Sequence, residues 1–196
     1  MSAGVLHDSV VSQIDWWWHA LFRRRIDGLT NDELWWAPID DAWTLHRGDD
    51  GEYRYEWPPG SLGETTPPFT TLAWRLCHLS LSGLAHWALL FEGVPNGGEV
   101  AMTMTFPATA DEAVALTDEW WTRWRAGLGA LDDDALRRPI GETPWCGERG
   151  ERTSGMKLGP NDPAVNFVLH HHRELIHHGA EISMLRDLYR ATKGTA

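Results

Sequence analysis

The sequence is poor in cysteine and in positive charge. Its two cysteines, Cys77 and Cys146, lie in neither a CxxC nor a Cys/His finger spacing. This excludes a disulfide framework and a cysteine-based zinc finger, and we expect two reduced thiols. Lys and Arg number 17 against 28 Asp and Glu, which gives a formal net charge of −11. Because this charge repels phosphates, we expect no nucleic-acid partner.

Membrane and targeting signals are also lacking. No stretch approaches the roughly 18 apolar residues of a membrane-spanning helix, and Met1–Asp8 shows no basic start followed by an apolar run. We therefore expect a cytoplasmic protein with no membrane partner. With 42% hydrophobic residues in 196, the chain can bury a core, and its length favours a single domain over residues 1–196.

Tryptophan, by contrast, is abundant. The chain has 13, including the runs Trp16–Trp18, Trp35–Trp36 and Trp120–Trp121. Three adjacent residues on a helix point in three directions, so the first run cannot all face one core. Core packing is the main interpretation for most of these residues. The alternative is an aromatic-walled ligand groove or a homodimer interface.

Apolar spacing and capping signals predict four long helices, at about 7–27, 71–91, 110–129 and 162–189. Capping boxes are predicted at Thr30 to Glu33 and at Thr109 to Glu112. Between the first two helices, residues 43–57 alternate around a Gly-Asp-Asp-Gly turn, which predicts a β-hairpin. Residues 139–160 are expected to form a long loop. The fold class that follows is all-α: an antiparallel four-helix bundle with a small β-hairpin insertion between the first and second long helices.

Five of the ten histidines lie between His170 and His178, inside the fourth predicted helix. At 100° per residue, His170, Glu174, His178 and Glu181 fall in one arc with apolar neighbours, which we take as the buried face. The same projection places His171 and His172 at the surface or at an edge. A buried carboxylate needs a cationic partner, and a metal ion is one.

Glu174 and His178 are one helical turn apart, so their side chains can converge on one ion. His78, in the second predicted helix, is the candidate third ligand, and the small residues that follow it leave space beside the ring. Two imidazoles and one carboxylate leave a coordination position open, and they suit Zn, Ni, Fe or Mn. Two alternatives stay open. In the first, His170 or His177 replaces one of these ligands. In the second, no metal is needed, because Glu174 pairs with Arg75 or Arg173 and the histidines are satisfied core or surface residues.

Three stretches resemble the DinB-like superfamily: Pro-Phe-Thr-Thr-Leu-Ala-Trp-Arg-Leu-Cys-His-Leu at 68–79, Arg-Glu-Leu-Ile-His-His-Gly-Ala-Glu-Ile at 173–182 and Leu-Arg-Asp-Leu-Tyr at 185–189. The resemblance implies a four-helix bundle with a divalent metal bound by one histidine of the second helix and two residues of the last. Matched by position, these are His78, Glu174 and His178. Because the set contains a glutamate, it resembles the metal-binding set of the mycothiol-dependent maleylpyruvate isomerases.

The resemblance implies a metal-dependent enzyme that uses a low-molecular-weight thiol such as mycothiol to modify or isomerise a small electrophile. The sequence ends at Ala196, soon after the last predicted helix. We therefore expect no further C-terminal domain of the kind those isomerases carry, and a different reaction. The alternatives are a metal-dependent hydrolase, a metal-holding stress or binding protein without turnover, and an inert bundle. We expect a small-molecule substrate for the thiol-dependent enzyme and for the hydrolase.

Overall fold

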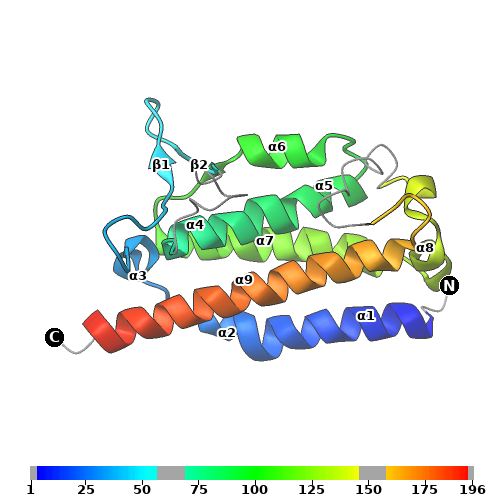
Figure 1. The fold of residues 1–196 in the computed structure, drawn as a ribbon, viewed down its shortest axis with the longest axis horizontal. Coiled ribbons are helices and arrows are strands. Elements are labelled where there is room, and N and C mark those ends of the chain that lie inside the picture. The colour runs from blue at the N-terminus through cyan, green and yellow to red at the C-terminus, as the bar shows by residue number, and fades with distance from the viewer. Residues whose placement is uncertain (1–3, 57–68, 146–157, 194–196) are drawn as a thin grey trace.

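The computed structural model describes residues 4–56, 69–145 and 158–193. Over these ranges the chain is mostly helical, with four long helical segments lying lengthwise (Figure 1). The first two segments each contain a π-helical stretch: α1 (Val5–Trp16), η1 (Trp17–Phe22) and α2 (Arg23–Arg25); then α4 (Leu72–Cys77), η2 (His78–Ala85) and α5 (His86–Phe91). The third and fourth are α7 (Ala110–Gly129) and α9 (Ala164–Lys193). Short helices connect them: α3 (Asn31–Trp35), α6 (Gly97–Thr103), α8 (Asp133–Arg137) and the 3₁₀ turn η3 (Ile140–Glu142).

The second and third long segments run in the same direction, opposite to α1 and α9 (Figure 1). Side-chain contacts agree, since Ser80 lies 2.8 Å from Thr117 early in both segments and Phe91 packs against Gly127 late in both. The predicted antiparallel arrangement is therefore wrong for this pair. The reason is the returning stretch of α6 and β3 (Thr105–Phe106), which carries the chain back before α7 begins.

The predicted β-hairpin is confirmed between the first and second long segments. Strands β1 (His46–Arg47) and β2 (Tyr53–Arg54) pair antiparallel, and Gly51 in the turn takes a φ of +86° that favours glycine. β3 adds a third antiparallel strand beside β2, which the sequence did not predict. The hairpin matters for function because Tyr55, just after β2, is buried against the second segment.

The helix caps test the predicted boundaries. The capping box at Thr30 is confirmed: its hydroxyl accepts from the Glu33 amide at 3.2 Å, and the Glu33 carboxylate accepts from the Thr30 amide at 2.9 Å. The box at Thr109 is wrong, because this hydroxyl donates to the Glu112 carboxylate at 2.5 Å and caps no backbone amide. Thr71 caps the second segment, as predicted, by accepting from the Trp74 amide.

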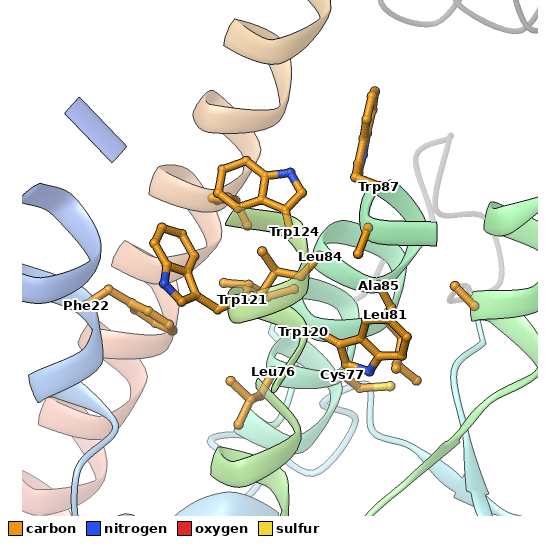
Figure 2. Close-up of a cluster of buried hydrophobic side chains, with 14 of the residues drawn as sticks. Phe22, Leu76, Cys77, Leu81, Leu84, Ala85, Trp87, Trp120, Trp121 and Trp124 are labelled. Carbon is orange, nitrogen blue, oxygen red and sulfur yellow. The ribbon is translucent and has the colours of Figure 1, made fainter. Parts of the chain in front are cut away.

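Most of the tryptophans whose positions are described pack in the core (Figure 2). Trp16 is 62% exposed while its neighbours Trp17 and Trp18 are buried, as expected for three adjacent helical residues. Gly179 of α9 permits close approach to the first segment, since a Cβ there would lie 2.4 Å from the Trp17 ring. Cys77 is a buried free thiol, whereas Cys146 lies outside the described residues. Within the described ranges, no helix is both long and apolar enough to cross a membrane.

Candidate metal centre

Helix α9 is turned by about one residue from the predicted orientation. Its buried face contains His171 and His172, at 2% and 5% exposure, and not the arc centred on Glu174. The prediction that these two histidines lie at the surface is therefore wrong. The apolar residues of the stripe set the rotation, and they are Phe167, Val168, Leu175 and Ile182. Glu174 and His178 consequently lie at the border of the core, partly exposed.

The structure brings His78 and His178 together across the interface between η2 and α9. Their Nε2 atoms are 3.0 Å apart, and an Oε2 of Glu174 lies 3.5 Å from the same His178 nitrogen. Two nitrogens bound to one divalent ion at ~2.0–2.1 Å lie roughly 2.8–3.4 Å apart, from the octahedral to the tetrahedral angle. The spacing of the two imidazoles therefore matches that of two ligands on one ion.

The outer nitrogens of both rings are held by other side chains. The Tyr55 hydroxyl lies 2.7 Å from His78 Nδ1, and the Glu181 carboxylate lies 2.7 Å from His178 Nδ1. A carboxylate only accepts hydrogen bonds, so His178 donates from Nδ1 and keeps the Nε2 lone pair for a metal. Arg75, at 3.4 Å from that Nδ1, makes the weaker contact. Such outer partners orient the histidine ligands of metal sites.

Local electrostatics favour neutral imidazole at His78. Burial, the adjacent His178 and the Arg75 guanidinium hold the pKa of His78 well below its usual value. Burial by itself would raise the pKa of Glu181, but the hydrogen bond from His178 and the charge of Arg75 outweigh it and lower that pKa. A neutral histidine beside ionised carboxylates is the protonation state that metal ligation requires.

Among the described residues, the three-ligand group whose ligand atoms lie mutually close is not the predicted set but a neighbouring one that shares His178. The ligand atoms of His177, His178 and Glu181 all lie within 4.8 Å of one another, and His177 Nε2 is 3.3 Å from Glu181. This set uses the outer side of His178, whereas the predicted set uses its Nε2. The His177 side chain is 63% exposed, and only the predicted set joins two helical segments. We therefore consider the predicted set the better candidate.

Arginine pairing, the alternative to metal binding, occurs only at the edge of the site. Arg173 lies 3.5 Å from Glu174, whose side chain is 40% exposed. Arg75 pairs instead with Glu181, at 3.1 Å. His170 lies beside Glu174 and Arg173, with its Nδ1 3.8 Å from Glu174. Glu174 is therefore partly exposed beside a guanidinium and an imidazole, so its burial does not by itself require a metal.

Tyr55 and Trp74 are the site residues that the sequence did not reveal. Trp74 stacks on the His78 ring with centroids 5.3 Å apart, and Tyr55 packs on both. Tyr55 comes from the hairpin, and its alternation with Tyr53 indicated a strand without indicating what the strand faces. η2 begins at His78, and π-helical stretches often occur at functional sites, but their position is not readable from residue spacing.

A protein-family model for the DinB superfamily matches residues 13–182 of this chain. The chain belongs to the DinB superfamily. Members of this superfamily bind metal in general, and the match spans His78, Glu174 and His178. No curated protein and no solved structure matched the chain.

The residues present fit a divalent ion. The donor set has two imidazoles and one carboxylate, with each imidazole fixed from its far side. In this superfamily member, His78, Glu174 and His178 would hold the metal, with Tyr55 and Glu181 orienting the rings.

Proposed function

We propose that this DinB superfamily protein is a metal-dependent enzyme that uses a low-molecular-weight thiol of the mycothiol type on a small electrophilic substrate. The metal ligands in this proposal are His78, Glu174 and His178, and the ion is Zn, Ni, Fe or Mn. The observation that carries the metal is the approach of two imidazole nitrogens to 3.0 Å, with the Glu174 carboxylate 3.5 Å from one of them, that of His178. The thiol rests on the likeness of the His, Glu, His set to mycothiol-dependent enzymes.

A divalent ion with an open position stabilises a thiolate over a thiol at neutral pH, and so supplies a nucleophile. The chain's own residues prepare that position. Tyr55 and Glu181 hold the imidazoles, and Arg75 adds a positive charge next to the site, 5.1 Å from the Trp74 ring. Trp74 and Tyr55 shield one side of His78 from water, which strengthens the local electrostatic interactions.

The test is calorimetric titration of mycothiol, bacillithiol and glutathione into metal-loaded protein. The proposal expects one of them to bind at one site per chain, and binding should be lost in His178→Ala. The matched control is His19→Ala, which replaces an exposed histidine of the first segment and should bind like the wild type. Failure of all three thiols, or equal binding to His178→Ala, would overturn the thiol and leave the metal site to be judged separately.

Metal-dependent hydrolysis is the second candidate, and one observation favours it. The Glu174 side chain is 40% exposed and lies between Arg173 and His178, so it could act as a general base beside the metal and not as a ligand. The two cases separate on Glu174→Gln. A base variant keeps its metal and loses activity, whereas a ligand variant loses metal.

A further inference from the structure

A second concave site lies between α1 and α9, on a different face of α9 from the one that meets His78. It is a groove of about 720 Å³, within the range of small-molecule sites. Its apolar lining comes from both helices, with Leu6 and Val10 on α1 and Val165, Leu169 and Ile176 on α9. None of the described residues that line it is acidic, although the chain has 28 Asp and Glu.

The polar groups of the groove lie toward one end of the α9 wall. Arg173 and His177 are 66% and 63% exposed at their side chains, and both follow the apolar positions Val165 and Leu169. Arg173 contacts Glu174 and His170, but a guanidinium has five donors, so these contacts leave donors available. The groove therefore has a mainly apolar end at Val165 and Leu169, and an end where the Arg173 guanidinium and the His177 imidazole lie beside Ile176.

A buried polar atom at this groove lacks a partner. His172 lines the groove and is 5% exposed, and its Nε2 forms no hydrogen bond. Burying an unpartnered nitrogen costs free energy, and because this atom has almost no exposed surface, a ligand oxygen reaches it only if the His172 ring rotates. The α9 wall from Val165 to His177 spans twelve residues, about 18 Å at 1.5 Å per residue, which is long enough for an extended hydrocarbon tail.

We propose that this groove binds an amphipathic carboxylate, with the hydrocarbon tail along Leu6, Val165 and Leu169 and the head group at Arg173 and His177. Charge complementarity favours the anion, because Arg173 is a cation and none of the described lining residues is acidic. The apolar walls select the tail through burial of hydrocarbon surface. The site needs no metal, although its head-group end touches the proposed metal centre through the contacts of Arg173 with Glu174 and of His177 with Glu181.

The experiment is titration of dodecanoate, below its micellar concentration, into the full chain, with dodecanol and dodecyltrimethylammonium as head-group probes. We expect one dodecanoate per chain and weaker binding of the other two. Leu169→Gln should weaken dodecanoate at least about tenfold. Met184→Gln is the matched control, since Met184 is an exposed apolar residue of α9, 61% exposed, outside the groove, and it should bind like the wild type. Arg173→Gln should weaken dodecanoate and leave dodecanol unchanged.

Equal binding to the Leu169 and Met184 variants would overturn the proposal, because it would indicate detergent-like adsorption. Preference for the trimethylammonium probe would overturn the choice of an anionic head. Sedimentation velocity of the same proteins supplies the remaining outcome. A wild-type dimer that Leu169→Gln converts to monomer would show that a second copy covers the groove, and would also overturn the proposal. Circular dichroism and thermal melting establish that each variant is folded.

Discussion

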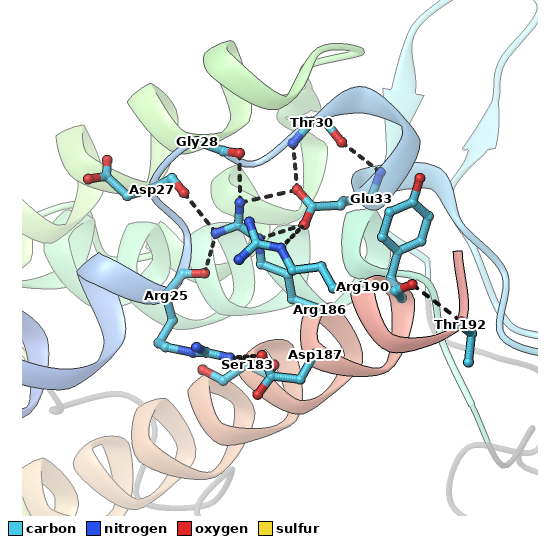
Figure 3. Close-up of polar contacts among 11 residues, drawn as sticks. Arg25, Asp27, Gly28, Thr30, Glu33, Ser183, Arg186, Asp187, Arg190 and Thr192 are labelled. Atoms are coloured by element: carbon cyan, nitrogen blue, oxygen red, sulfur yellow. Dashed lines mark hydrogen bonds and ion pairs between the residues drawn. The ribbon is translucent and has the colours of Figure 1, made fainter. Parts of the chain in front are cut away.

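Arg186 and His171 are both buried on α9, at 1% and 2% exposure, yet their polar atoms have opposite surroundings. The Arg186 guanidinium makes five hydrogen bonds, two to the Glu33 carboxylate and three to backbone carbonyls of residues 25, 27 and 28 (Figure 3). Five is the number of N–H donors that arginine has. A buried charge with every donor satisfied is a structural clamp between α9 and the turn after α2.

His171 shows the reverse arrangement. It packs between the Trp87 and Trp124 rings, with centroids 5.1 and 5.0 Å away, and neither of its ring nitrogens has a hydrogen-bond partner. Burial and the neighbouring histidines hold the pKa of His171 well below its usual value, and the nearby Gly83 backbone opposes this only weakly. An uncharged ring in an aromatic cage is tolerated, and the Gly83 backbone is one polar group of the protein that acts on it.

The metal centre lies between these two extremes. His78 and His178 have their Nδ1 atoms satisfied by Tyr55 and Glu181, while their Nε2 atoms face each other. Full satisfaction by backbone and carboxylate partners thus marks the structural arginine on α9, and two imidazoles whose Nε2 atoms converge mark the candidate site. The comparison makes predictions at each of the three places.

The largest expected effect is at the clamp. Arg186→Met leaves the Glu33 charge buried with only Arg190 as a side-chain partner, so we expect a loss of about 3–5 kcal/mol in the free energy of unfolding. Arg190→Met is the matched control: Arg190 also contacts Glu33, at 2.7 Å, but its side chain is 52% exposed, and its loss should cost about 1 kcal/mol or less. Urea denaturation measures both. Equal losses would break the contrast between a satisfied buried charge and a surface pair.

The pH dependence of stability tests the same clamp. Burial by itself would raise the pKa of Glu33, but hydrogen bonds from Arg186, the Thr30 amide and Arg190 lower it to about 2. Because this folded-state pKa is depressed, the stabilisation is complete above the unfolded value near 4.5 and is lost as pH falls toward 2. The free energy of unfolding should fall by up to about 3 kcal/mol from this group between pH 5 and 2.

In Glu33→Gln, which cannot titrate at this position, the fall over the same pH range should be smaller than in the wild type. Urea denaturation at a series of pH values measures it. An identical slope in the two proteins would show that Glu33 does not carry the acid dependence.

The sequence indicated the components of the centre better than their surroundings. Glu174 and His178 could be paired from their one-turn spacing, and the helices were bounded by caps such as Thr30. The rotation of α9 about its axis was harder to predict. The prediction centred the buried face on polar residues, whereas packing of Leu175 and Gly179 against two other segments determines it. Tyr55 could not be found, since it reaches His78 through a hairpin whose docking depends on tertiary contacts.

At His171 we expect a smaller effect, and a gain in stability where a loss is usual. His171→Leu removes two unpartnered nitrogens and keeps an apolar side chain in the cage, so the free energy of unfolding should rise by about 1 kcal/mol. Thr117→Val is the control, because its hydroxyl is buried but bonded to Ser80 and to the Ala113 carbonyl, and its removal should cost about 1 kcal/mol. A clear loss in His171→Leu would mean that the ring has a partner such as an ordered water.

Metal content by elemental analysis, after purification without chelator, tests the central claim most directly. The account predicts one divalent ion per chain in the wild type and in His177→Ala, and loss of that ion in His78→Ala, Glu174→Ala and His178→Ala, since two protein ligands hold a divalent ion poorly. Loss of the ion in His177→Ala with retention in His78→Ala would contradict it, and would place the ion in the cluster of His177, His178 and Glu181.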